Sequence, residues 1–544
     1  MLSYRKLAMR VLGRPLHTEG IDSPRPASQR AAALVLTAAM LTTLAAPAFA
    51  DIWRIEDGDI TVKAGETEGT NKVSQGTNKD VVDTNTIITN QNKDTTSSHT
   101  VTIETNDKND KVEVTLKDVN IDTSSRNKAA VSVTGEGDTN IKLDGDNALK
   151  SDIYRSGIYG SGSGSLTISG GENDSLTAQG GSGANGISSS GSLTISGGTV
   201  TANGDDGGRG ISSSGSVTIS GGSTVTANGG SGTISGGDGI CSSGGVTISG
   251  GSTVTANGGN GGSLVGGDGI RSGGGLTVSD GTVTAKGGNG DSKDGYGGDG
   301  IRSGGVVTIS GNTVNAAGGY GGKVGGYGIC SFDRVAISGG TVEAAGGNGS
   351  TGGGSGIYSS VIDLSGSLEL TAKAGSPTGK ALLQNGRELD LDTIKDKLGP
   401  GAKVTATDAN GDSKQVSIPR PVEPEEPVIP EESSSSSDGG SATPSAPVSP
   451  LPGLTVTDKD GQRISYTSTQ SGNALTVCVG RLTASLRISL AALRQMRAEG
   501  IETITFQTIL CSTTLSVDEL LAMGGEDAEA VLTHRFTDSS LTVD

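Results

Sequence analysis

The central part of the chain, from Gly157 to about Gly375, repeats one short pattern of apolar and polar positions. Each copy starts with Gly-Ile, runs through serine and glycine to Leu/Val-Thr-Ile-Ser-Gly-Gly, and ends in Thr-Val-Thr-Ala followed by more glycine. The Gly-Ile isoleucines lie 24 to 31 residues apart, at Ile158, Ile187, Ile211, Ile240, Ile270, Ile301, Ile329 and Ile357. A period of this length, kept through eight copies, predicts a repeat architecture.

Inside one copy, apolar residues alternate with polar ones at every second position. In the copy at 239–258, this alternation covers Val246 to Ser249 and Thr253 to Ala256, and Gly-Gly separates the two runs. Period-two alternation over about four residues is typical of short strands. Strands this short have no core of their own, so we expect each to pair in parallel with its copy in the next repeat. The pattern predicts an all-β parallel β-helix (solenoid) with coils of about 28–31 residues.

Four columns of equivalent residues are predicted to fill the interior of this solenoid. One is the series of Gly-Ile isoleucines. The other three are Ile168, Ile195, Ile219, Ile248, Val278, Ile309 and Ile337; Val200, Val225, Val254, Val283, Val314 and Val342; and Ala178, Ala202, Ala227, Ala256, Ala285, Ala316 and Ala344. Successive coils should rise by about 4.8 Å, the spacing of paired strands.

Bulk composition favours the opposite interpretation, a low-complexity or disordered chain. The sequence has 92 glycines and 2% aromatic residues, which is a composition poor in core-forming side chains. Periodicity decides against disorder, because a disordered linker has no reason to keep apolar residues in register. No proline occurs between Asp51 and Ser376, as a backbone that uses its N–H groups in ladders requires.

Residues 1–50 are predicted to be a signal peptide. Six basic residues precede or flank an apolar stretch from Ala31 to Ala46, and Ala48-Phe49-Ala50 forms an A-x-A cleavage site. A membrane anchor is the alternative for this short, alanine-rich run. Cleavage before Asp51 would leave 35 basic and 57 acidic residues, a net charge of −22. That charge argues against nucleic acid and anionic membrane surfaces as partners, and no other apolar run approaches membrane-spanning length.

The remaining segments divide by composition. Residues 51–156 are expected to form less regular N-terminal coils and a cap, with Trp53 covering the exposed core. Residues 157–376 are the glycine-rich repeats, and residues 377–418 should form a C-terminal cap with a short helix from Leu391 to Leu398 and a hairpin at Asn410-Gly411. Residues 419–452 hold nine of the fifteen prolines and are predicted to be a linker. Residues 453–544 are predicted to form a small C-terminal α/β domain.

Four cysteines in an exported chain raise the question of disulfides. Cys241 and Cys330 occupy equivalent places three coils apart, a separation of roughly 14 Å, which exceeds the reach of a disulfide. Cys478 and Cys511 lie in the C-terminal domain, and the sequence leaves open whether they pair.

An acidic ladder is the first candidate site. Asp238, Asp268 and Asp299 each stand two residues before a Gly-Ile isoleucine on three successive coils. Carboxylates about 4.8 Å apart repel one another unless a cation lies between them, and Ca²⁺ is a fitting cation. The alternative, which we favour, is that Asp-Gly is turn sequence whose charge is offset by Arg271 and Arg302.

Two further candidates concern the outer surface. Threonines repeat on the predicted outward face, as in Thr199/Thr201 and Thr253/Thr255, and regular hydroxyl arrays can dock ordered surfaces such as polysaccharide or ice. Threonine also simply suits exposed strand positions. Sugar rings stack on tyrosine, and six tyrosines lie outside the core columns and are candidate ligand-binding residues: Tyr154, Tyr159, Tyr296, Tyr320, Tyr327 and Tyr358.

Three N-terminal stretches carry a family resemblance. The sequences at 51–62, 112–121 and 144–151 resemble the opening of bacterial secreted right-handed β-helix proteins, some of which are described as carbohydrate-binding. The Gly-Ile coils, the Pro/Ser linker and the small α/β tail resemble surface proteins of gut-type Gram-positive bacteria. The resemblance implies a right-handed helix and a polysaccharide or cell-surface glycan as partner.

Two functions remain in competition. The first is a protein that is secreted, or held at the cell surface or cell wall, that binds carbohydrate or adheres and has no catalytic activity. The second is a polysaccharide lyase or hydrolase of the pectate-lyase-like fold. Pectate lyases use clustered aspartates with a basic residue, and this sequence shows no such cluster and has only His17, His99 and His534 as histidines. We therefore expect no catalytic residues, and no cofactor other than the candidate calcium.

Overall fold

The computed structural model describes residues 52–419, apart from Asn312, and most of residues 453–543. In the second range the residues left out are 459–461, 465, 472, 480, 482, 509–511, 524–528, 536 and 537. The chain divides into two compact units near residue 424, and each is described by itself. The predicted signal peptide, most of the predicted linker and Cys511 lie outside the described residues.

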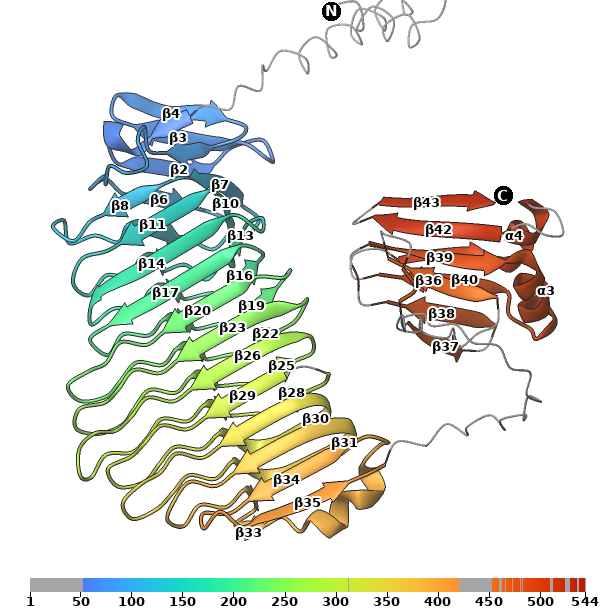
Figure 1. Ribbon diagram of the computed structural model, residues 1–544. Coiled ribbons are helices and arrows are strands. Elements are labelled where there is room, and N and C mark those ends of the chain that lie inside the picture. Colours follow the sequence, from blue (N-terminus) through green and yellow to red (C-terminus); the bar gives the residue numbers. More distant parts are fainter. Residues whose placement is uncertain are drawn as a thin grey trace, which may run out of the picture. The chain divides into compact units, whose positions relative to one another are not determined.

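The N-terminal unit is a parallel β-solenoid (Figure 1), as the repeat pattern predicts. Each coil contributes one strand to each of three parallel sheets. Sheet 1 contains β2 (Ile60–Ala64), β6 (Val101–Glu104), β9 (Val131–Thr134), β12 (Ile158–Gly160), β15 (Ile187–Ser189), β18 (Ile211–Ser213), β21 (Ile240–Ser242), β24 (Ile270–Ser272), β27 (Ile301–Ser303), the first parts of β30 (Ile329–Ala345) and β31 (Ile357–Lys373), and β32 (Leu382–Gln384).

The other two sheets follow sheet 1 within each coil. Sheet 2 contains β1 (Ile52–Arg54), β5 (Ile87–Thr89), β7 (Lys111–Lys117), β10 (Asp138–Asp144), β13 (Leu166–Ser169), β16 (Leu193–Ser196), β19 (Val217–Ser220), β22 (Val246–Ile248), β25 (Leu276–Val278), β28 (Val307–Ile309) and the middle of β30 and β31. Sheet 3 contains β8 (Asn120–Asp122), β11 (Asp146–Lys150), β14 (Ser175–Ser182), β17 (Thr199–Asp205), β20 (Thr224–Asn228), β23 (Ser252–Asn257), β26 (Gly281–Lys286), β29 (Thr313–Ala317), the ends of β30 and β31, and β34 (Lys403–Thr407).

The four predicted columns form the core. Strand register pairs Ile219 with Ile248, Val225 with Val254 and Ala227 with Ala256, and the Gly-Ile isoleucines pair from coil to coil in the same way. Nearly every column residue is fully buried. Identical side chains therefore stack in one continuous apolar interior, which stabilises coils that could not bury their strands alone.

Glycine-rich loops close each coil between sheets 3 and 1. Their outgoing and returning arms are linked by backbone hydrogen bonds that zigzag from coil to coil. Gly259 N donates to Gly237 O (2.8 Å), Gly267 N to Gly259 O (2.8 Å), and Gly288 N to Gly267 O (2.8 Å). No side chain fits between the arms, because a Cβ on Gly267 would overlap the carbonyl of Gly237. Backbone packing replaces side-chain packing in this part of the coil.

Both ends of the solenoid depart from the repeat. Near the N-terminus, β2 continues antiparallel into β3 (Asn71–Gln75) and β4 (Asn78–Asp83), after the short 3-10 helix η1 (Ile55–Asp57). Trp53 is buried there, and its Nε1 donates to Asp83 Oδ2 (2.9 Å). At the other end lie β33 (Arg387–Glu388), the 3-10 helix η2 (Leu391–Lys397) and β35 (Ser413–Ser417), which pairs antiparallel with β34 around Asn410-Gly411. These hairpins interrupt the parallel ladder at both ends.

The C-terminal unit has two four-stranded sheets and two short helices among its described residues. One sheet contains β36 (Leu454–Thr457), β39 (Thr483–Ser489), β42 (Glu529–Arg535) and β43 (Asp538–Val543), and the other β37 (Thr467–Ser471), β38 (Ala474–Cys478), β40 (Thr503–Gln507) and β41 (Ser512–Ser516). The helices are α3 (Leu490–Ala498) and α4 (Val517–Met523). Only β38 and β40 pair in parallel, so the predicted α/β domain consists mostly of antiparallel sheet.

Candidate functional site

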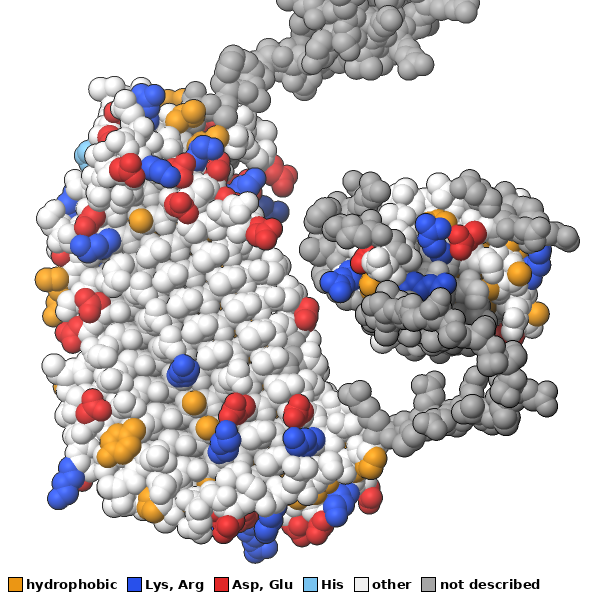
Figure 2. Space-filling model, in the orientation of Figure 1, with side chains coloured by type: hydrophobic (Ala, Val, Ile, Leu, Met, Phe, Trp, Pro, Cys, Tyr) orange, Lys and Arg blue, Asp and Glu red, His pale blue; other side chains and the backbone are white. Residues whose placement is uncertain are grey.

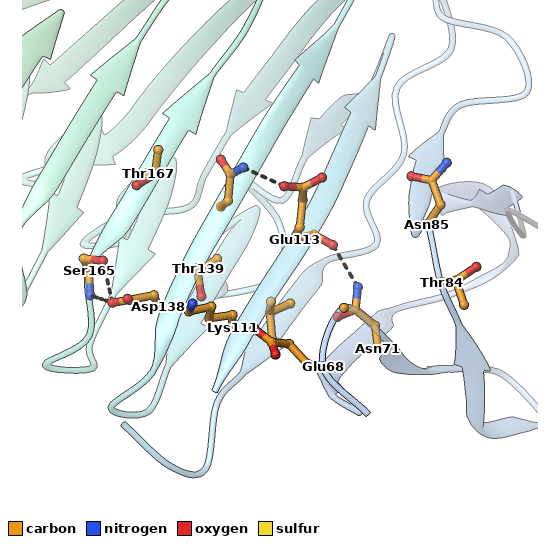
Figure 3. A pocket seen from close by; sticks show the side chains of 13 residues that line it. Glu68, Asn71, Thr84, Asn85, Lys111, Glu113, Asp138, Thr139, Ser165 and Thr167 are labelled. Atoms are coloured by element: carbon orange, nitrogen blue, oxygen red, sulfur yellow. Dashed lines mark hydrogen bonds between the residues drawn. The ribbon is translucent and has the colours of Figure 1, made fainter. Parts of the chain in front are cut away.

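A polar groove lies near the N-terminal end of the solenoid, on the outer surface of sheet 2 (Figure 3). It encloses about 430 Å³ between the turn at Glu68 and Gly69, which joins β2 to β3, and the strands β7, β10 and β13. On these strands Lys111, Glu113, Asp138, Asn140 and Thr167 occupy the outward positions of the period-two pattern, whereas Val112 and Thr139 are buried. The groove residues are Glu68, Gly69, Asn71, Thr84, Asn85, Lys111, Val112, Glu113, Asp138, Thr139, Asn140, Ser165 and Thr167.

Hydrogen bonds between successive coils hold the side chains of this groove. Asn140 Nδ2 donates to Glu113 Oε2 (2.9 Å), and Ser165 Oγ donates to Asp138 Oδ1 (2.5 Å). From the hairpin, Asn71 Nδ2 donates to the carbonyl oxygen of Glu113 (2.8 Å). The result is a set of fixed carboxylate, amide and hydroxyl groups from several coils, next to the ammonium group of Lys111. Such an arrangement can bind a polyhydroxylated ligand through many hydrogen bonds.

The groove opens onto a long row of hydroxyl groups. Strand register places Glu113, Asn140 and Thr167 in one outward column of sheet 2. The column continues with Thr194, Thr218, Thr247, Thr277 and Thr308. In the view of Figure 2, charged side chains gather toward the two ends of the solenoid, and the middle coils show a broad surface with very few charges. A neutral, regularly spaced hydroxyl surface therefore extends from the charged groove.

The acidic ladder Asp238, Asp268 and Asp299 is a separate feature beside sheet 1. All three carboxylates are buried, and each accepts the backbone N–H of the equivalent residue one coil further on. Asp238 Oδ1 accepts from Asp268 N (2.9 Å), Asp268 Oδ1 from Asp299 N (2.8 Å), and Asp299 Oδ1 from Tyr327 N (2.7 Å). Likewise, the side-chain oxygen Oδ1 of Asn185 accepts the backbone N–H of Arg209 (2.8 Å). The aspartates thus continue the ladder of backbone hydrogen bonds where the chain turns.

Arginines lie over the second oxygen of each of these carboxylates. Arg209 Nε is 3.2 Å from Asp238 Oδ2, Arg271 Nη1 is 3.9 Å from Asp268 Oδ2, and Arg302 Nη1 is 3.2 Å from Asp299 Oδ2. Arg271 and Arg302 are the residues expected to offset the charge. The described residues contain no group of three or more His, Cys, Asp or Glu side chains arranged to hold a metal ion. Calcium at Asp238, Asp268 and Asp299 stays a prediction.

The buried ladder should make the stability of the solenoid depend on pH. Burial, together with the carboxylates of Asp299 and Asp238, raises the pKa of Asp268 from 3.8 to about 8, and burial raises that of Asp299 to about 6. The folded state then holds more protons than the unfolded state between about pH 4 and pH 8, so this contribution to stability is lost as pH rises through that window. We expect Asp268→Asn to raise the melting temperature at pH 8, by a stabilisation on the order of a few kcal/mol, and to change it little at pH 4.

Asn185 supports this choice of variant, because it shows that an amide oxygen at the same position accepts the next backbone N–H. Melting temperatures of the wild type and of Asp268→Asn between pH 4 and pH 8 test the prediction, and equal pH slopes for the two proteins would contradict it.

The same melts with Ca²⁺ and with a chelator test the calcium prediction. A bound cation would keep the carboxylates ionised and raise the wild-type melting temperature only when Ca²⁺ is present.

The six candidate tyrosines do not form one site. Tyr327 and Tyr358 lie in consecutive coils and stack, with ring centroids 5.0 Å apart. Tyr296 lies on a glycine-rich loop, where the Lys323 ammonium is 5.6 Å from its ring centroid. Tyr154, Tyr159 and Tyr320 are exposed, and among the described residues their rings contact no other aromatic ring. Only the stacked pair is brought together by the fold.

The cysteines of the repeats stand as expected. Cys241 and Cys330 occupy one outward column of sheet 1, with Arg271 and Arg302 between them, and neither forms a disulfide. The question of a pair between Cys478 and Cys511 falls on a residue outside those described.

Comparison with protein-family models, with curated proteins and with solved structures finds no match to this chain. In the part of the chain that the structure describes, no helix has both the length and the apolar character needed to cross a membrane.

The residues of the N-terminal groove were not among those selected from the sequence. Their outward positions could be read from the alternation in Val112 to Leu116, but the hairpin that overhangs them could not.

Proposed function

We propose that this protein is a secreted or cell-surface solenoid that binds an extended polysaccharide or cell-surface glycan without cleaving it. The observation that carries the proposal is the N-terminal groove of about 430 Å³, which is lined by hydrogen-bonding side chains of successive coils and leads onto the hydroxyl column of sheet 2. Export rests on the signal peptide predicted at residues 1–50.

The geometry suits a linear ligand that lies along the solenoid axis. One part of the glycan would enter the groove, where Glu113, Asp138 and Asn140 offer acceptors and donors for its hydroxyl groups. The rest would follow the column from Thr167 to Thr308, meeting one hydroxyl about every 4.8 Å. Many weak contacts at a fixed repeat add up along a polymer, in the manner of multivalent binding.

A polysaccharide lyase or hydrolase is the second candidate function. The observation in its favour is that Glu68, Glu113 and Asp138 line the same groove as Lys111, and acidic and basic groups in one cleft are what such catalysis needs. Against it, Glu113 and Asp138 each already accept a hydrogen bond from a side chain of the next coil. We place non-catalytic binding first.

Retention of the protein on insoluble neutral polysaccharides, together with an assay for released sugars, tests the proposal. We expect weak retention without any release of reducing-end or unsaturated sugars. The variant Asn140→Ala removes an amide from the groove and should weaken binding about tenfold, which corresponds to about 1.4 kcal/mol. A double variant, Thr218→Lys with Thr247→Lys, places bulky charges on the hydroxyl column and should also reduce retention.

Asn410→Ala is the matched control, since Asn410 is exposed on the hairpin between β34 and β35, far along the chain from the groove. It should bind like the wild type. Release of sugars by the wild type would replace the proposal with the enzyme function. Equal retention of Asn140→Ala and Asn410→Ala would exclude the groove as the binding site.

A further inference from the structure

A second groove runs along the corner between sheet 1 and the glycine-rich loops. It encloses about 660 Å³, and its charged lining residues are Arg209, Asp238, Asp268, Arg271 and Arg302. Most of the other lining residues are glycines of the loops, including Gly237 and Gly267, and the rest are Asn185, Ser235 and Val265. Where glycine lines the groove, no side chain stands between a ligand and the backbone, so the ligand can approach the backbone closely.

The three arginines offer far more hydrogen-bond donors than their aspartate partners use. A guanidinium group has five N–H donors, whereas Arg209 and Arg302 each make one hydrogen bond to a carboxylate, and the 3.9 Å pair of Arg271 is longer than a hydrogen bond. The side chains of Arg209, Arg271 and Arg302 are 43%, 52% and 37% exposed, respectively, while the paired carboxylates are nearly fully buried. The positive groups therefore face the groove, and the carboxyl groups lie beneath them.

The arginines are spaced along the solenoid axis. Arg271 and Arg302 are paired in register on consecutive coils, about 4.8 Å apart. Arg209 belongs to the coil two steps before that of Arg271, so the three charges span roughly 14 Å. Aromatic rings lie close to Arg302, outside the residues that line the groove. The Arg302 guanidinium lies 5.1 Å from the ring centroid of Phe332, and Tyr327 follows Asp299 in the ladder and stacks on Tyr358.

We propose that this groove is an anion-binding site for a linear acidic glycan, whose carboxylate or sulfate groups pair with Arg209, Arg271 and Arg302. Guanidinium groups bind both kinds of oxyanion through charge-assisted hydrogen bonds. The stacked tyrosines next to Arg302 supply a surface for the apolar face of a sugar ring. A nucleic acid fits less well, because its sequence-independent affinity comes from neutralising many phosphates, whereas this groove offers three arginines. The site is separate from the N-terminal groove and does not depend on the function proposed there.

Binding of three soluble polymers to the full protein tests this inference: polygalacturonate as the carboxylate polymer, dextran sulfate as the sulfate polymer, and dextran as the neutral control. We expect binding of one or both acidic polymers, weaker at higher salt, and none of dextran in this groove. Binding of only one acidic polymer identifies the anion as carboxylate or sulfate. Failure of both to bind would overturn the proposal.

The variants are designed to remove the arginines without leaving buried charges unpaired. Arg271→Gln/Arg302→Gln combined with Asp268→Asn/Asp299→Asn neutralises both ion pairs and keeps an oxygen for each backbone N–H, as Asn185 does. This quadruple variant should lose at least about tenfold in affinity for the acidic polymer. Asp268→Asn/Asp299→Asn alone keeps both arginines and should bind at least as tightly as the wild type.

Lys286→Gln is the control for loss of a positive charge outside the groove, because it removes one exposed positive charge from sheet 3 of the same region. Its affinity should be unchanged. The quadruple variant leaves the formal net charge unchanged, so a loss in it is not an effect of net charge. An equal loss in Lys286→Gln would show that a cationic side chain elsewhere on these coils contributes as much, and would overturn the site. Retention on insoluble neutral polysaccharide, which depends on Asn140, should be the same in all of these variants, so the failure of one proposal is distinguishable from the failure of the other.

Discussion

The Gly326→Ala variant is expected to lose about 3 kcal/mol or more of solenoid stability, although it adds a single methyl group. Gly326 is buried in a glycine-rich loop, where its N–H donates to Gly319 O (2.9 Å) and its carbonyl accepts from Gly347 N (2.8 Å). A Cβ at this position would overlap the carbonyl oxygen and carbon of Gly298 one coil below. Because these atoms are backbone, relief of the overlap requires separating two coils and breaking hydrogen bonds of the zigzag.

Gly352→Ala provides the matched control in the next coil. Its added Cβ would meet nothing nearer than Thr378 Oγ1 at 3.5 Å, which is an ordinary contact. Thermal or denaturant melts followed by circular dichroism should therefore show a large loss for Gly326→Ala and a small change for Gly352→Ala. Equal melting temperatures for these two variants would mean that the loop arms are not packed backbone to backbone.

Ile248→Asp is expected to be at least as damaging, through a different mechanism. Ile248 is fully buried and lies in register between Ile219 and Val278. A carboxylate there would have apolar neighbours above and below it and no partner, and an unpaired charge in such surroundings costs several kcal/mol or forces the group to bind a proton. We expect the solenoid to unfold at a much lower temperature, or not to fold at all.

Thr247→Asp separates the effect of burial from the effect of the acidic residue. Thr247 is the neighbour of Ile248 and points outward from the same strand, where it is exposed. Its replacement should change the melting temperature only slightly. If the protein produced with Ile248→Asp melts like the one with Thr247→Asp, the assignment of the interior column is wrong.

The solenoid core was predictable because its signal is local and repeated. In Val246 to Ser249, inward and outward residues alternate, and the same sequence pattern recurs one coil later. Both the strand and the strand it pairs with can therefore be identified from the sequence. The outward column of threonines follows from the same alternation. The prediction that Trp53 is buried at the end of the solenoid is also confirmed. The reason for it was that a large aromatic side chain at the start of a repeat array can cover the exposed end of the core.

The two grooves were not predictable in the same way, because each depends on contacts between different segments. Asn71 reaches Glu113 only because β3 and β4 fold back as an antiparallel hairpin. The sequence of residues 71–83 has no repeat that predicts this hairpin. The aspartates beside sheet 1 were visible, and so was their offset by Arg271 and Arg302. That the carboxylates are buried beneath exposed guanidinium groups depends on the path of the glycine-rich loops, which glycine alone leaves undetermined.

The zigzag of backbone hydrogen bonds also constrains how this chain can change its length. Gly259, Gly288 and Gly319 are equivalent residues on consecutive coils. The N–H of each donates to the preceding coil, and its carbonyl accepts from the returning arm of its own loop. Excision or duplication of one complete repeat therefore brings equivalent ends together and leaves every remaining bond with a partner, whereas loss of a fraction of a repeat does not. Gain or loss of whole repeats would therefore lengthen or shorten the solenoid in whole coils, about 4.8 Å at a time.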